Sequence, residues 1–228
     1  MTEPRTTIRL WDLPLRLFHW GVVVLIPLMW WTNKQGNMER HQMFGLMLLF
    51  LLVFRIVWGL IGSETARFTS FVKGPFTIAS YLTGKDKTPS VGHNPLGALS
   101  VVALIVVLLA QIGLGLFSQD TDGLFSGPLN HFIPASDPDL GDKVHHWHKL
   151  GFTLILVLVG VHLAAILFYT LVKKERLVPP MVTGRKVVEP GVPQPTIAPL
   201  WRVLPALLVA GVVTWWVAHG ANWPPLPH

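Results

Sequence analysis

Five long apolar stretches constrain the fold more than any other feature of this sequence. About half of the residues are hydrophobic and only 13% are charged. Each stretch is long enough to cross roughly 30 Å of hydrocarbon as a helix, and a bilayer offers the backbone of a spanning segment no partners outside the segment itself. The sequence therefore predicts five transmembrane helices, at about residues 13–31, 43–61, 95–117, 150–172 and 200–218.

The distribution of lysine and arginine predicts the orientation of these helices, because basic residues are enriched in cytoplasmic loops. One side of the membrane holds only Lys34, Arg40, Lys143 and Lys149. The other side holds twelve basic residues: Arg5, Arg9, Arg16, Arg67, Lys73, Lys85, Lys87, Lys173, Lys174, Arg176, Arg185 and Lys186. We expect the N-terminus inside and the C-terminus outside, and we interpret the formal net charge of +6 as a topology signal rather than as nucleic-acid binding.

A proline-rich segment separates the fifth helix from the rest of the chain. Residues 178–199 read VPPMVTGRKVVEPGVPQPTIAP, a composition typical of an extended linker. The sequence thus predicts three parts: a four-helix domain at 1–177, a cytoplasmic linker at 178–199, and a fifth transmembrane helix with a short periplasmic tail at 200–228. The outer loop at 118–144 carries mostly acidic charge, including Asp120, Asp122 and Asp137.

The stretch HHWHKLGFTLILVLVGVH places two histidines on one face of a predicted helix. His148 and His162 are fourteen residues apart, just under four turns, so they lie about 21 Å apart along the helix axis. A single intramembrane histidine is also explained by a hydrogen bond to a neighbouring helix. A pair points to function, since ionisable groups inside a membrane are rare and usually functional.

Two further histidines lie at matching depths on other predicted helices. His41 precedes the apolar start of the second helix by two residues, just as His148 precedes Leu150. His19 enters the first helix from inside, where His162 arrives from outside. The sequence predicts an outer pair, His41 with His148, and an inner pair, His19 with His162.

Two imidazoles from facing helices form the axial ligand set of a haem in a helical bundle. The chain has no cysteine, which excludes iron–sulfur clusters and covalently attached c-type haem. The histidines therefore predict two haem b groups in an all-α membrane protein: a transmembrane four-helix bundle plus a fifth, appended helix. An iron with two imidazole ligands passes single electrons and leaves no position open for substrate.

Two arginines are candidates for contacts with the inner haem. Arg55 lies fourteen residues after His41 and so reaches the level of the inner haem. It suits a haem propionate or a quinone carbonyl, and snorkelling to the inner interface is the alternative. Arg16 lies one turn before His19 and suits an inner propionate or a lipid phosphate.

The remaining histidines near the helices leave alternatives open. His145 and His146 replace His148 as ligand if the helix register is shifted. His93, in GHNPLG, either caps the third helix or contacts a propionate. The third helix contains no histidine, and we expect it to be scaffold.

Taken together, WDLPLRLFHW at His19, the H-x3-G pattern at His41, GHNPLG, WHKLGFTLILVLVGVH and MVTGRK resemble the bacterial di-haem cytochrome b family of four-helix membrane proteins. That family includes the b-type cytochrome subunit of nickel-iron hydrogenases, the gamma subunit of formate dehydrogenase, and superoxide oxidase. The resemblance covers about residues 9–186. It implies haem ligation by His19, His41, His148 and His162, and electron exchange between membrane quinone and a periplasmic partner at the bacterial inner membrane.

Several functions remain compatible with this pattern. The leading hypothesis is electron relay between quinone and a periplasmic c-type cytochrome or oxidoreductase subunit. One alternative hypothesis is a superoxide:quinone oxidoreductase. Another is an anchor or assembly subunit of a respiratory complex. A metal-ion transporter using the histidine pairs for zinc requires acidic residues beside them, and the predicted spans contain none apart from interfacial Asp12.

Overall fold

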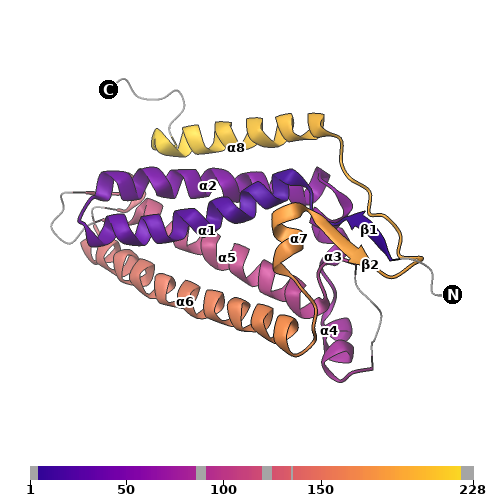
Figure 1. Cartoon of the computed structure of the whole chain (residues 1–228). Helices are drawn as coiled ribbons and strands as arrows, with labels where there is room; N and C mark the ends of the chain where they lie inside the picture. The colour runs from indigo at the N-terminus through magenta and orange to yellow at the C-terminus, as the bar shows by residue number, and fades with distance from the viewer. Residues whose placement is uncertain (1–4, 86–90, 120–124, 135, 222–228) are drawn as a thin grey trace. The chain divides into compact units, whose positions relative to one another are not determined.

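Helices dominate the computed structural model, which describes residues 5–85, 91–119, 125–134 and 136–221 (Figure 1). The long helices are α1 (Leu13–Lys34), α2 (Met38–Ile61), α5 (Pro95–Phe117), α6 (Pro138–Leu171) and α8 (Val203–Ala218), the last preceded by a 3-10 turn at Leu200–Arg202. Within these described ranges, five helical segments are long and apolar enough to cross a membrane. The predicted all-α membrane fold with five spanning helices is confirmed.

Many apolar side chains on these helices are exposed, as lipid-facing positions require. Leu60, Val106, Val161 and Leu208 are each more than half exposed. A soluble monomer rarely exposes large contiguous apolar patches. The exposed faces therefore fit a hydrocarbon environment.

Short elements connect the long helices. They are a 3-10 turn at Glu64–Ala66, α3 (Phe68–Phe71), α4 (Pro75–Leu82), a 3-10 turn at Asn130–Phe132, and α7 (Val178–Thr183). Two strands, β1 (Thr6–Arg9) and β2 (Arg185–Val188), pair antiparallel in a two-stranded sheet, with Thr6 opposite Val188 and Arg9 opposite Arg185.

The expectation of an extended linker over residues 178–199 does not hold for its first half. There the chain forms α7, turns through Gly184 in the left-handed region (φ +77°), and continues as β2. Only the part from 189 to 199 lacks helix and strand. The strand forms because β1 supplies hydrogen bonds from the far end of the chain, a long-range pairing that local composition does not reveal.

Two helices begin earlier than their apolar stretches. α2 starts at Met38 because Asn37 caps it, its side-chain oxygen accepting the Arg40 backbone N–H at 3.1 Å. α6 starts at Pro138, a residue suited to a first helical turn, and its 34 residues exceed what the hydrocarbon alone requires. The apolar stretches identify only the membrane-spanning part of each helix. Polar residues extend α2 and α6 beyond that part. α5 occupies the predicted range of 95–117.

The chain divides into two compact units. The first comprises Met1–His19, Arg55–Ala103 and Val159–Ala206, and the second comprises Trp20–Phe54, Leu104–Leu158 and Leu207–His228. His19, Arg55 and His162 belong to the first unit, and His41 and His148 belong to the second. Each predicted histidine pair therefore falls within one unit.

Asp12 organises the core of the first unit. Its Oδ1 accepts the Leu15 backbone N–H at 2.8 Å, so Asp12 caps α1, and its Oδ2 accepts the Trp58 indole N–H at 2.9 Å. Trp58 is 1% exposed. Close by, the Thr65 hydroxyl donates to the Leu10 carbonyl at 2.6 Å. The carboxylate thus fixes the start of α1 against the end of α2.

Some positions named in the sequence analysis lie outside the described residues. These are Lys87, Asp120, Asp122 and the tail at 222–228.

Replacing Asp12 by Ala tests this arrangement. The variant loses the helix cap, worth about 1 kcal/mol, and leaves the buried Trp58 N–H without its charged acceptor, worth about 1.5–3 kcal/mol. We expect a clear fall in the thermal unfolding midpoint of the detergent-solubilised protein, measured by circular dichroism. Asp139→Ala, at the exposed start of α6, is the control and is expected to change stability by less than about 0.5 kcal/mol.

Candidate functional site

The outer histidine pair comes together in the second unit. His41 lies in the first turn of α2 and His148 lies on α6. Their ring centres are 6.2 Å apart and their ring planes stand at 84°. The ring that faces His41 thus belongs to His148, while the His145 ring lies within hydrogen-bond distance of the Ser118 hydroxyl at 2.9 Å.

This separation meets the requirement of an axial ligand pair. With metal–imidazole bonds of about 2 Å and roughly 1.1 Å from each Nε2 to its ring centre, two axial imidazoles place their ring centres about 6 Å apart. The observed 6.2 Å agrees with that value. The residues present therefore fit a haem iron held between His41 and His148.

Hydrogen bonds to backbone carbonyls set the tautomer of both outer rings. His41 Nδ1 lies 2.9 Å from the Met29 carbonyl oxygen on α1, and His148 Nδ1 lies 3.1 Å from the Gln111 carbonyl oxygen on α5. A carbonyl only accepts, so each Nδ1 carries the proton and donates it. Each Nε2 then keeps its lone pair, the arrangement found in metal-ligating histidines.

Gln111 holds His148 a second time through its side chain. Its Nε2 donates to the His148 carbonyl oxygen at 2.9 Å, and the residue is 7% exposed. A Cβ at Gly151 would lie 2.1 Å from Gln111 Oε1, so the Gln111 amide in this conformation occupies the space that a side chain at position 151 would fill. The pair Gln111 and Gly151 thus fixes the position of the outer histidine.

The expectation that the third helix is plain scaffold is therefore wrong for the outer site. Helix α5 supplies the acceptor for the His148 ring and the donor to its backbone. The sequence did carry a signal: Gln111 is a lone polar amide inside an apolar helix, and polar groups in membranes are usually functional.

Gly45 leaves room beside the outer pair. It lies one turn after His41 and hence on the same face of α2. A Cβ built there would meet only the Met29 terminal methyl, at 3.7 Å. A flat macrocycle requires such an open approach to the helix.

The inner pair lies in the first unit. His19 is on α1 and His162 is on α6, and the two imidazoles are close enough to interact electrostatically. Both are in the same compact unit as Arg55.

Arg55 is a buried cation without an anion of its own. It is 1% exposed, and neither Nη atom has a hydrogen-bond partner in the described part of the chain. Its Cζ lies 4.7 Å from the Phe68 ring centre, with Phe18 and Phe71 at 6.0 and 5.9 Å. The nearby carboxylate of Asp12 is already bonded to Leu15 and Trp58. Since a buried unpaired charge is costly, this site is suited to an additional anion.

His93 lies at the inner end of α5 and does not cap it. Asn94 is the cap, its Oδ1 accepting the Gly97 N–H at 2.7 Å. The His93 ring packs between Trp11 and Phe71, at 4.7 and 4.8 Å. Burial, together with the charges of Arg55 and His162, lowers the pKa of His93 to about 4. The ring is neutral at physiological pH, and contact with a propionate stays a prediction.

Arg16 is held by the segment after the fourth span. Its Nη1 donates to the Val182 carbonyl at the end of α7, and its Nε is buried without a hydrogen-bond partner among the described residues. One donor of Arg16 is therefore committed to α7, and Nε is left for another acceptor.

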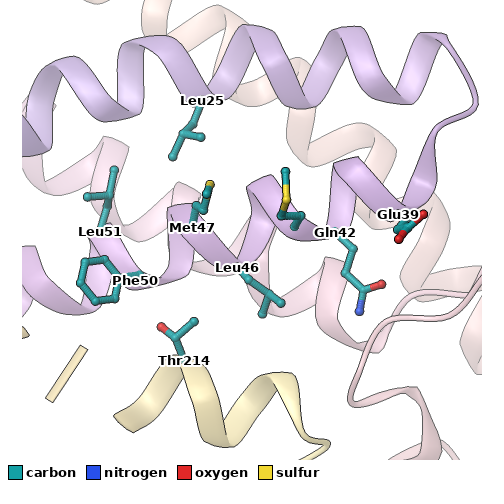
Figure 2. A pocket seen from close by; sticks show the side chains of 9 residues that line it. Leu25, Glu39, Gln42, Leu46, Met47, Phe50, Leu51 and Thr214 are labelled. Carbon is teal, nitrogen blue, oxygen red and sulfur yellow. The ribbon is translucent and has the colours of Figure 1, made fainter. Parts of the chain in front are cut away.

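An apolar groove lies along another face of α2. Its volume is about 710 Å³, and Figure 2 shows Leu46 and Phe50 of α2 facing Thr214 of α8 across it. The lining is mostly apolar. None of the six predicted site residues is among the described residues that line it.

Comparison with known proteins identifies the chain's relatives. The family model described as prokaryotic cytochrome b561 matches residues 10–184. The probable Ni/Fe-hydrogenase B-type cytochrome subunit of Azotobacter vinelandii is 26% identical over 218 residues, covering 79% of this chain and 88% of the relative. The probable Ni/Fe-hydrogenase 1 B-type cytochrome subunit of Escherichia coli K12 is 22% identical, covering 76% and 88%. No solved structure matches significantly. The resemblance inferred from the motifs is confirmed.

Two glycines of α5 offer a matched test of the outer site. A Cβ at Gly115 would lie 2.9 Å from His148 Cε1, whereas a Cβ at Gly113 would meet nothing within 4 Å. Alanine raises helix propensity equally at both positions, by about 1 kcal/mol. We expect Gly113→Ala to be neutral or stabilising and Gly115→Ala to be destabilising by about 1–3 kcal/mol through overpacking. Thermal unfolding in detergent measures both, and equal effects would contradict the packing of Gly115 on His148.

Proposed function

This chain belongs to the prokaryotic cytochrome b561 family, and from that premise we propose that it holds two haem b groups and relays electrons between membrane quinone and a periplasmic redox partner. Membership makes it an integral membrane b-type cytochrome with a role in electron transfer. The number of haems, their ligands and the two redox partners are the proposal.

The outer pair is the observation that carries this proposal. His41 and His148 come from different helices, and their ring centres are separated by 6.2 Å. Both Nδ1 atoms donate to carbonyl oxygens, so each Nε2 keeps a lone pair suited to iron, and the His148 Nε2 lies 3.5 Å from the Gln111 amide nitrogen. Two imidazole donors suit an axial haem pair, whereas a structural zinc takes four ligands.

The inner site is proposed by the same logic with one addition. His19 and His162 would be the axial ligands, and Arg55 would pair with a propionate through its unpartnered Nη atoms. Arg16 would contribute its free Nε to a propionate of the same haem. A carboxylate in this place would neutralise the buried guanidinium.

The chain's own residues perform three tasks in such a relay. When bound, each haem would supply a one-electron iron couple. The imidazoles of His41 and His148 hold their orientation because Met29 and Gln111 accept their N–H groups, which also strengthens Nε2 as a donor. Buried apolar residues such as Leu48 and Leu52 keep water out of the space between the helices. Exclusion of water favours outer-sphere electron transfer over chemistry at the metal.

The relatives support a redox enzyme as partner. Their names describe them as probable B-type cytochrome subunits of Ni/Fe-hydrogenases. We propose a periplasmic oxidoreductase subunit or c-type cytochrome at the outer side and quinone as the membrane partner. The bias of basic residues supports a cytoplasmic N-terminus in the inner membrane.

Haem stoichiometry tests the proposal. The purified protein is expected to show the reduced absorption bands of haem b at two haems per chain. His41→Ala and His148→Ala are each expected to lose the outer haem and keep the inner one. His19→Ala and His162→Ala are each expected to lose the inner haem and keep the outer one. The pyridine haemochrome assay against protein concentration measures these ratios.

His145→Ala and His146→Ala are the matched controls, because both residues lie within three positions of His148. Both variants are expected to retain two haems. A protein that binds a single haem, or one in which His146→Ala and His148→Ala behave alike, would contradict the ligand assignment.

Arg55→Leu tests the role of the buried cation. A positive charge favours the reduced, less positive iron, so its removal is expected to lower the inner haem potential by on the order of 60 mV, the one-electron equivalent of a tenfold change in equilibrium constant. Spectroelectrochemical titration measures the shift. Arg55→Lys keeps the charge and is expected to lower the potential less. An unchanged potential in Arg55→Leu would place Arg55 outside the inner site.

A further inference from the structure

We propose that the first unit binds the phosphate of an anionic phospholipid head group between Arg9 and Arg185, at the end of the β1–β2 sheet. This inference concerns a surface separate from the histidines and does not rest on the proposed electron relay.

The two arginines are cross-strand partners. Arg9 ends β1, Arg185 begins β2, and the two are directly opposite in the antiparallel register. Directly opposed residues of an antiparallel pair have Cβ atoms about 5 Å apart, and like charges there destabilise the sheet. Neither guanidinium forms a salt bridge within the described part of the chain, where the two ion pairs are Arg5–Glu189 and Lys186–Glu175. A bound anion would offset this repulsion.

A pocket of about 530 Å³ lies beside the pair. Its lining includes both arginines together with Thr7, Gln194, Pro195 and Ile197. Two arginine forks and a threonine hydroxyl provide hydrogen-bond donors for a phosphodiester, and Arg is the side chain best matched to phosphate oxygens. The lining thus combines donors for the phosphate with apolar surface from Pro195 and Ile197.

Hydrogen bonds to the backbone fix one wall of the pocket. The Arg9 backbone N–H donates to Gln194 Oε1 at 3.1 Å, and Gln194 Nε2 donates to the Arg9 carbonyl at 3.1 Å. The amide therefore continues the hydrogen bonding of β1 on its far side. The oxygen and the nitrogen of the Gln194 amide both have hydrogen-bond partners already. The arginine side chains are therefore the donors left for a ligand.

The position of the pocket favours a lipid over a soluble phosphate. Arg9 precedes Leu13, the first residue of the first spanning helix, by four positions. Ile197 precedes Leu200, the first residue of the fifth span, by three. The pocket thus lies where two segments enter the membrane, at the level of head groups, on the side that we expect to face the cytoplasm. Anionic lipids on that side attract such basic groups.

Lipid titration of the full-length detergent-solubilised protein, followed by native mass spectrometry, tests the proposal. The probes are phosphatidylglycerol and phosphatidylcholine, at about 0.15 M salt, where the Debye length is about 8 Å. We expect phosphatidylglycerol to bind at least about fivefold more tightly than phosphatidylcholine. Arg9→Gln and Arg185→Gln are each expected to weaken phosphatidylglycerol binding by about fivefold and to leave phosphatidylcholine binding unchanged.

Lys73→Gln is the matched control, because Lys73 is an exposed cation of the same unit that does not line the pocket. It is expected to change binding by less than about twofold, since more distant charges are screened. The proposal is overturned if the native protein binds both lipids equally, or if Lys73→Gln weakens binding as much as Arg185→Gln. Displacement of the lipid by an equal concentration of inorganic phosphate would also overturn it, since the site would then take free phosphate.

Discussion

An imidazole placed in hydrocarbon must have partners for both ring nitrogens, because no water is present to supply them. The outer site follows from this constraint. Nδ1 of His41 and of His148 are satisfied by carbonyl oxygens of Met29 and Gln111, on helices other than their own. Nε2 of His148 lies 3.5 Å from the Gln111 amide nitrogen, and the two ring centres are 6.2 Å apart, a spacing that suits an iron between them. Four helices thus contribute to the position of one histidine pair.

The same constraint applied to a cation explains Arg55. Aromatic faces surround the guanidinium, and cation–π contacts recover part of its lost hydration. They leave its Nη hydrogens without acceptors in the described part of the chain. The carboxylate of Asp12 interacts with this cation but is already bonded to Leu15 and Trp58, so the site is suited to a further anion. A haem propionate has the chemistry that our proposal requires of it.

Sequence patterns predicted what depends on local hydrophobicity and helical spacing. The apolar runs marked all five spans, α5 to within the residue, and the fourteen-residue interval placed His148 and His162 on one continuous helix. Pairings between distant parts of the chain were not predictable. The sheet of β1 and β2 was missed because neither strand has a distinctive pattern of its own. The role of Gln111 was missed because it depends on a backbone carbonyl and on Gly151. Neither feature identifies its partner from the sequence alone.

The pairing of residues 6–9 with residues 185–188 also has a consequence for biosynthesis. At translation rates of roughly 5–20 residues per second, the first strand waits about ten to forty seconds for its partner to emerge. Four spans have left the ribosome by then. The sheet that joins the two ends of residues 6–188 therefore cannot form until all four of these spans have been synthesised.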